Sequence, residues 1–306
     1  MATALVLQQE LADRLNLDQT VAANATKLQR WLNLIQQDFC GRQNWKFLEE
    51  REAVAITIDY TTGTAEVTNA SATVTGTGTV WVAAHVRSFI QFADNNDDWY
   101  EITARGSNTS ITISPAFQGT TDTSTTYTIR KVFYPLSASA EDILDIRQYQ
   151  SPRKLTCYGF RAVDRYRPNM AASGNPVGYY KYRLDPDVAA TAAKAIQFVL
   201  EPAPSAAMIL EVRIKKILAD YAATDGNISQ VPVRWHNIML DGAEAMGRMH
   251  LNDPGYQNAR DRYEEGVGRA MAEDRALGDR NVVIGSQQET QASRWLPFPS
   301  NYEQPL

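Results

Sequence analysis

The sequence is poor in cysteine and histidine. Its 306 residues include two cysteines, Cys40 and Cys157, and three histidines. So few cysteines cannot build a framework of several disulfides, and they lack the second pair that a four-cysteine zinc site requires. We expect both thiols to be reduced and buried.

Long apolar runs are absent as well. None approaches the roughly 18 residues of a membrane-spanning helix, and the first residues, Met1 to Leu5, lack the basic and apolar regions of a signal peptide. The net charge of -5, with 21% charged and 44% hydrophobic residues, is close to balanced. These values predict a soluble globular protein that stays in the cytoplasm where it is made and does not bind polyanions through bulk charge.

Catalytic motifs are missing too. His236 and His250 fall on one predicted helix about 21 Å apart, which is too far to share a metal ion. Gly76-Thr77-Gly78 lacks the later glycine, lysine and hydroxyl residue of a nucleotide-binding loop, and no Gly-x-Ser-x-Gly sequence occurs. We therefore predict that the protein is not an enzyme and has no cofactor and no metal site.

One acidic cluster leaves alternatives open. It consists of Asp94, Asp97, Asp98 and Glu101. A glycosidase could use two such carboxylates. Because Asn95 and Asn96 lie among them, we favour a solvated turn or a weak calcium site over catalysis.

Two amphipathic helices are predicted at the amino-terminal end. Their apolar stripes are Leu7, Leu11 and Leu15, and then Leu28, Trp31, Leu32, Ile35 and Phe39. Gly41 is placed to end the second helix. Trp45 and Phe47 follow where the pattern changes to alternation, and we expect their rings to anchor the core at the helix-to-sheet junction.

Residues 63–134 predict an inserted β-domain. This stretch is rich in Thr, Val and Ile, alternates as in Ile111-Thr112-Ile113, and is divided by turn sequences. Five or six short strands fit a small antiparallel sandwich or barrel. Its aromatic residues could form a carbohydrate-stacking platform, but a module of this size needs aromatics for its own core, which is the role that we favour. These residues are Trp81, Phe89, Phe92, Trp99 and Tyr127.

Helices and strands follow Pro135. Ser139 and Asp142, with Ile143 and Ile146, predict a short helix that ends before Pro152. Strands are predicted at 179–183, 195–200 and 208–217. Two helices with apolar stripes over 235–249 and 256–270 then form a hairpin, in which Asp253 caps the second helix.

Residues 278–306 show neither a helical nor a strand period. Large apolar side chains nevertheless gather near their end, and the interface candidates are Trp295, Leu296, Phe298 and Tyr302. We favour an extended arm that docks on another subunit or partner over a segment packed on its own subunit, because its prolines lower the entropic cost of docking.

Basic residues form two groups. The first is Arg161, Arg165 and Arg167, and the second is Arg213, Lys215 and Lys216. These side chains, Arg161, Arg165, Arg213 and Lys215 above all, could face DNA in a channel or form ion pairs between subunits, and the sequence leaves both roles open.

Together these patterns predict an α+β protein. Residues 1–62 and 135–277 are expected to form a helical-bundle frame with a short β-sheet. Residues 63–134 form the inserted antiparallel β-sandwich or barrel domain, and residues 278–306 form the extended C-terminal arm.

The order of several short motifs resembles the head-to-tail adaptor, or connector, proteins of tailed bacteriophages. The resemblance covers about residues 5–276, and the order of the motifs carries it more than any single one. The motifs are Trp31-Leu32-Asn33, Asn44-Trp45-Lys46-Phe47, Tyr127-Thr128-Ile129-Arg130, Gly174-Asn175-Pro176 with Tyr179-Tyr180, Ile196-Gln197 to Pro202, Val231-Pro232-Val233-Arg234-Trp235 and Leu251-Asn252-Asp253-Pro254.

The resemblance implies a structural virion protein of the phage neck or tail, assembled in the host cytoplasm. Such a protein forms a ring of about twelve copies between the portal protein and a tail or nozzle protein, and DNA passes through its channel without sequence specificity. The insert is larger than the adaptor pattern requires, which leaves open whether tail fibres or tailspikes are further partners. The alternative is a β-rich receptor- or glycan-binding tail module.

Overall fold

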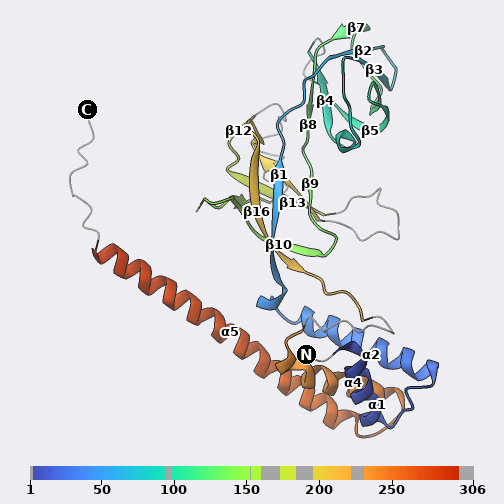
Figure 1. Ribbon diagram of the computed structural model, residues 1–306, viewed down its shortest axis with the longest axis vertical. Coiled ribbons are helices and arrows are strands. Elements are labelled where there is room, and N and C mark those ends of the chain that lie inside the picture. Colours follow the sequence, from blue (N-terminus) through green and yellow to red (C-terminus); the bar gives the residue numbers. More distant parts are fainter. Residues whose placement is uncertain are drawn as a thin grey trace. The chain divides into compact units, whose positions relative to one another are not determined.

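The chain forms two compact units. The computed structural model describes residues 3–93, 98–151, 153–159, 173–183, 196–221 and 231–295, and for residues 183 and 277–295 it describes the backbone alone. Unit 1 comprises residues 1–48 and 218–306, and unit 2 comprises residues 49–217. The α-helices of the described chain belong to unit 1 and the strands of its named sheets to unit 2 (Figure 1).

Unit 1 is built from α1 (Ala4–Leu15), α2 (Ala22–Gly41), α4 (His236–His250) and α5 (Tyr256–Trp295), with short 3-10 helices η1 (Lys46–Leu48) and η3 (Val233–Trp235). Local signals determine where these helices begin and end. Thr3 Oγ1 accepts a hydrogen bond from Val6 N at the start of α1, and Asn16 ends it in the left-handed conformation (φ 52°). The predicted end of the second helix at Gly41 is confirmed.

The core of unit 1 centres on Trp45. Its side chain is fully buried, and its ring centroid lies 4.4 Å from that of Phe39 and 5.0 Å from that of Trp235. Its Nε1 donates a 2.7 Å hydrogen bond to the Phe39 carbonyl, so the indole is buried with its polar group satisfied. The prediction that Trp45 anchors the core is confirmed, and Phe47 packs against the same cluster while partly exposed.

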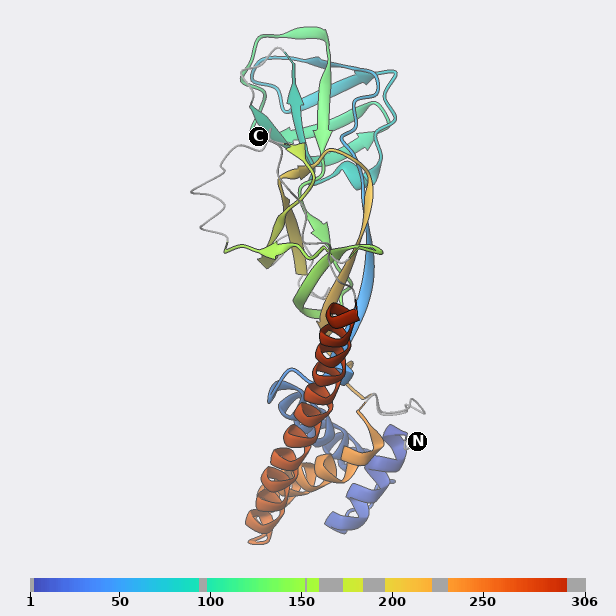
Figure 2. The ribbon, with the colours of Figure 1, turned by 90° about the vertical axis from the view of Figure 1, so that its left-hand side faces the viewer.

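The largest sheet of unit 2 is antiparallel and has seven strands, which curl as Figures 1 and 2 show. Its strand order is β7-β2-β3-β6-β5-β4-β8. The strands are β2 (Thr64–Val67), β3 (Thr73–Thr77), β4 (Phe89–Phe92), β5 (Trp99–Ser107), β6 (Ser110–Ser114), β7 (Asp122–Thr125) and β8 (Tyr127–Arg130), with the 3-10 turn η2 (Ala83–His85) before β4.

This sheet encloses an apolar core of its own. Trp81, Phe92 and Tyr127 are buried in it, whereas Phe89 and Trp99 are partly exposed. Most of the aromatic side chains that could have offered a stacking surface for sugars are therefore inside the domain.

Three further sheets complete unit 2. One has the order β1-β16-β10, with β1 (Glu49–Ile56), β16 (Met208–Lys216) and β10 (Ala140–Gln148) all antiparallel to their neighbours. The next has the order β11-β13-β14-β9, with β11 (Thr156–Cys157), β13 (Gly178–Arg183), β14 (Ile196–Glu201) and β9 (Tyr134–Pro135). The last pairs β12 (Ser173–Gly174) with β15 (Ala203–Pro204).

The predicted fold class, a helical-bundle frame that carries a β-domain, is wrong. The described residues contain sixteen strands and four α-helices, so this part of the chain is rich in β-structure and does not have a helical-bundle frame. Residues 135–217, which we assigned to the helical frame, contribute strands wherever the structure describes regular elements there. The strands predicted at 179–183, 195–200 and 208–217 are confirmed as β13, β14 and β16. They also group with the β-strands of unit 2 rather than with the helices.

The misassigned helix near Ser139 is strand β10, and its bulges explain the error. Its register against β16 shifts between Ala140 and Asp142 and again between Ile143 and Asp145. Each bulge inserts an extra residue, so the buried side chains are Ala140, Ile143 and Ile146, three residues apart. That spacing imitates the period of a helix, although the segment is the edge strand of a three-stranded sheet.

Two smaller expectations also fail. Residues 278–295 are not an extended arm but continue α5, which runs without a break to Trp295 (Figure 2). No proline interrupts the chain between Pro254 and Pro297, and residues of high helix propensity are frequent there. Helix propensity therefore explains the helical conformation of this segment, although it lacks an apolar period. The cysteines are not both buried, because Cys157 is exposed and Cys40 is partly exposed.

Gly247 allows α1 and α2 to approach α4 closely. A Cβ atom at this position would lie 2.4 Å from Leu15 Cδ1 and 3.2 Å from Trp31 Cζ3. We expect Gly247→Val to lower the free energy of unfolding of unit 1 by about 1–2 kcal/mol, since the core has to move to accept it. Urea denaturation followed by the helical circular dichroism signal measures this.

Gly268 on α5 is the matched control. A Cβ atom there meets nothing within 4 Å, so Gly268→Ala should stabilise by about 0.5–1 kcal/mol through helix propensity alone. Equal effects of the two substitutions would contradict the close approach at Gly247.

Candidate functional site

The structure places only some of the predicted site residues. Trp295 is the last residue of α5 and its backbone alone is described, while Leu296, Phe298 and Tyr302 lie outside the described residues. Arg161, Arg165 and Arg167 lie outside them too, as do Asp94 and Asp97 of the acidic cluster. Arg213 and Lys215 are on β16.

Arg213 and Lys215 form ion pairs within the chain. Arg213 Nη1 lies 4.0 Å from Glu49 and 3.8 Å from Asp145, and Lys215 Nζ lies 2.9 Å from Glu141. On the same strand Glu211 accepts two hydrogen bonds from Arg147, which lower the pKa of its carboxyl. The charges of this sheet thus largely neutralise one another, which leaves little free positive charge here for the phosphates of DNA.

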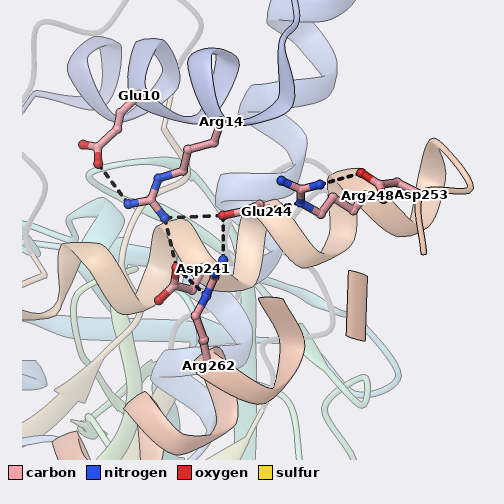
Figure 3. Close-up of polar contacts among 7 residues, drawn as sticks. All are labelled: Glu10, Arg14, Asp241, Glu244, Arg248, Asp253 and Arg262. Carbon is pink, nitrogen blue, oxygen red and sulfur yellow. Dashed lines mark hydrogen bonds and ion pairs between the residues drawn. The ribbon is translucent and has the colours of Figure 1, made fainter. Parts of the chain in front are cut away.

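A connected group of ionised side chains joins three helices of unit 1. We call it the Glu244 cluster, and Figure 3 shows its members: Glu10, Arg14, Asp241, Glu244, Arg248, Asp253 and Arg262. The Glu244 side chain is only 7% exposed and receives an arginine from each of α1, α4 and α5. Its oxygens lie 3.5 Å from Arg14, 2.7 Å from Arg248 and 3.0 Å from Arg262.

Neighbouring carboxylates complete this cluster. Asp241 Oδ1 lies 2.9 Å from Arg14 and 3.6 Å from Arg262, and Glu10 pairs with Arg14 at 3.0 Å. Because a buried carboxylate is stable only when it is paired, the arrangement holds α1 and α5 against α4. The role of the Glu244 cluster is therefore structural.

The cluster also orders the turn between α4 and α5. Asp253 Oδ1 accepts a 2.8 Å hydrogen bond from Gly255 N, and Asp253 Oδ2 accepts one from Arg248. The backbone hydrogen bond, with Arg248 beside it, lowers the pKa of the Asp253 carboxyl. The helical hairpin predicted around Asp253 is therefore stabilised at its turn by the ionised Asp253 carboxylate.

The helices α2, α4 and α5 also border a groove of about 280 Å³. We call it the α2–α4–α5 groove. Its apolar walls include the buried Ile35, Gly242 and Tyr263 and the partly exposed Met246, and Met249 at its edge is 61% exposed. A Cβ atom on Gly242 would lie 2.8 Å from the Tyr263 ring and 2.9 Å from Ile35, so the glycine keeps this wall open.

Charged and polar groups border one side of the groove. Asp38 accepts hydrogen bonds from Arg42 (3.0 and 3.1 Å) and from the Tyr263 hydroxyl (2.7 Å), and Arg42 also pairs with Glu264. Burial and the bond to Asp38 raise the pKa of Tyr263, so its hydroxyl remains a donor. Among the described residues Arg260, which also lines the groove, makes no ion pair.

Sequence reasoning missed both features. The spacings Glu10 to Arg14 and Glu244 to Arg248 are each four residues, the usual signal of a pair on one helix face. No spacing could reveal that Arg14 and Arg262 meet at Glu244, because they come from opposite ends of the chain. The groove was missed for the same reason.

In the ranges that the structure covers, no three or more His, Cys, Asp or Glu side chains gather closely enough to hold a metal ion. None of the helices in this part of the chain combines the length and apolar character needed to cross a membrane. No protein-family model matches the sequence, and no protein of curated function matches it.

Proposed function

We propose that this chain is a structural assembly protein, and that within this class it is a head-to-tail adaptor of a tailed bacteriophage. In this role several copies form a ring between the portal protein and a tail or nozzle protein, and DNA passes through the central channel. Tail fibres or tailspikes are candidate further partners through the seven-stranded sheet.

The length of α5 carries this proposal. The helix has 40 residues, and Figure 1 shows its C-terminal half extending past α1, α2 and α4 of the same unit. A helix half that extends past the other helices of its unit is placed to contact another protein chain, as in a ring or at a portal.

The resemblance in the order of motifs supports the more specific part of the proposal. Several of these motifs occupy structural positions in unit 1: Trp31-Leu32-Asn33 lies on α2, Trp45 in the core, and Val231 to Trp235 before α4. Asn33 links α2 to a distant part of unit 1, because its side chain donates a hydrogen bond to the Tyr221 carbonyl and accepts one from the Tyr221 backbone N–H. The glycan-binding alternative gains less support, since Trp81, Phe92 and Tyr127 are buried.

The test mixes the full chain with the portal protein encoded in the same phage genome. We expect the chain alone to be largely monomeric by light scattering and to form closed rings on portal particles in negative-stain images, because weak contacts become strong when a template holds many neighbours together. A stable free trimer that ignores the portal and binds a soluble sugar would refute the adaptor and favour the glycan-binding module.

A further inference from the structure

The α2–α4–α5 groove has the character of a peptide-binding site. It combines buried apolar walls at Ile35 and Tyr263 with the flexible, partly exposed side chains of Met246 and Met249. Methionines adapt their shape and contact aromatic rings favourably. At about 280 Å³ the groove can accept one or two large side chains of a chain segment, rather than a whole cofactor.

The chain contains one short segment of matching chemistry. Residues 295–302 read Trp-Leu-Pro-Phe-Pro-Ser-Asn-Tyr, with one proline on each side of Phe298. Proline restricts the free segment, so that less conformational entropy is lost when it binds. Glu303 follows directly, and Arg260 at the groove forms no ion pair with a described carboxylate, although Asp38 and Glu264 line the same groove.

Geometry excludes the groove of the same chain. The groove is lined by the first turns of α5, at Tyr256 and Tyr263, whereas the tail leaves α5 at its last residue, Trp295. At 1.5 Å per residue the helix separates Tyr263 from Trp295 by about 48 Å. A fully extended chain places Phe298 at most about 11 Å from Trp295, and Tyr302 at most about 25 Å from it. Neither side chain can reach back.

We propose that residues 296–303 of one copy bind in the α2–α4–α5 groove of a second copy, with Phe298 as the anchor between Met246 and Met249. The donor and acceptor surfaces differ, so the contact is heterologous, and it forms a ring when the rotation between neighbouring copies closes. This contact rests on the proposed function, because an adaptor ring needs a contact between its subunits. The contact itself requires no portal.

The test measures the binding of a fluorescently labelled peptide of residues 294–306 to the full chain by anisotropy, at protein concentrations where the chain is monomeric. We expect saturable binding that weakens at least about tenfold in Met249→Glu, because the anchor loses its apolar contact. Exchanging Phe298 for Asp in the peptide should weaken binding by about the same factor.

Val233→Glu serves as the matched control. Val233 is 57% exposed, close to the 61% of Met249, and does not line the groove, so this variant should bind the wild-type peptide within about twofold of the native chain. Circular dichroism of both variants verifies that unit 1 is folded. Failure of the peptide to bind the native chain, or equal affinity for the native chain and Met249→Glu, would overturn the proposal.

A second measurement uses the full chain at high concentration. Phe298→Asp has an intact groove and a damaged tail, whereas Met249→Glu has a damaged groove and an intact tail. Each variant alone should therefore stay monomeric in sedimentation velocity. Their mixture should form dimers and nothing larger, because only the tail of Met249→Glu and the groove of Phe298→Asp can bind each other. A mixture that remains monomeric while the native chain self-associates would place the contact elsewhere. Neither of these two measurements contains a portal protein. If both detect the contact between copies but no ring forms on portal particles, the adaptor function is refuted and the contact between copies still stands.

Discussion

Replacing Trp45 with alanine is expected to lower the free energy of unfolding of unit 1 by about 3–5 kcal/mol, the usual cost of truncating a buried Trp to alanine. Trp45 is fully buried, stacks on Phe39 and contacts Trp235, so its removal leaves a cavity at the centre of the core. The loss is a large part of the 5–15 kcal/mol that holds a typical domain folded. Urea denaturation followed by the helical circular dichroism signal reports on unit 1, because the described α-helices belong to it.

Trp45→Phe is the graded control for this prediction. Phenylalanine keeps much of the buried ring but removes the Nε1 hydrogen bond to the Phe39 carbonyl, so we expect a smaller loss of about 1–2 kcal/mol. If the alanine variant were as stable as the phenylalanine variant, Trp45 would not be the centre of the core.

Glu244→Ala is expected to cost about 2–3 kcal/mol. Removing one partner of a buried ion pair leaves the other charges without compensation, which costs about 3–5 kcal/mol when the whole pair is buried. We reduce that figure because the side chains of Arg14 and Arg248 are each 27% exposed and that of Arg262 is 54% exposed, so water partly compensates them. The same denaturation measurement applies.

The neighbouring pair of Glu10 and Arg14 provides the control. The Glu10 side chain is 46% exposed, and an exposed pair four residues apart on a helix contributes about 0.3–0.5 kcal/mol. Glu10→Ala should therefore change the stability several-fold less than Glu244→Ala does. Similar losses for both would show that the Glu244 cluster is only a surface arrangement, and raising the salt concentration would then abolish both.

The helices of unit 1 could be predicted because their signals are local. The apolar stripe from Leu28 to Phe39 follows the helical period, and Gly41 supplies its end. Trp45 could be predicted as a core residue from its size alone. In each case a few consecutive residues contain all the information.

Strand β10 could not be predicted, because its side-chain period depends on its neighbour. Its bulges exist only relative to the register of β16, and they place Ile143 and Ile146 on one face. The continuation of α5 to Trp295 failed differently. Our prediction for residues 278–295 depended on finding an apolar period, which is lacking there. High helix propensity and the absence of proline indicate the helix instead.

By itself, then, the sequence determined helices α1, α2 and α4, the antiparallel strands of the insert and the aromatic core, because periodicity, caps and turn residues act over a few positions. Only the tertiary structure decided that residues 140–148 form a strand and that Arg14 and Arg262 converge on Glu244. It likewise brought Ile35, Gly242 and Tyr263 to one groove. Such sites join residues from distant parts of the chain, and their positions follow from packing, which no local pattern encodes.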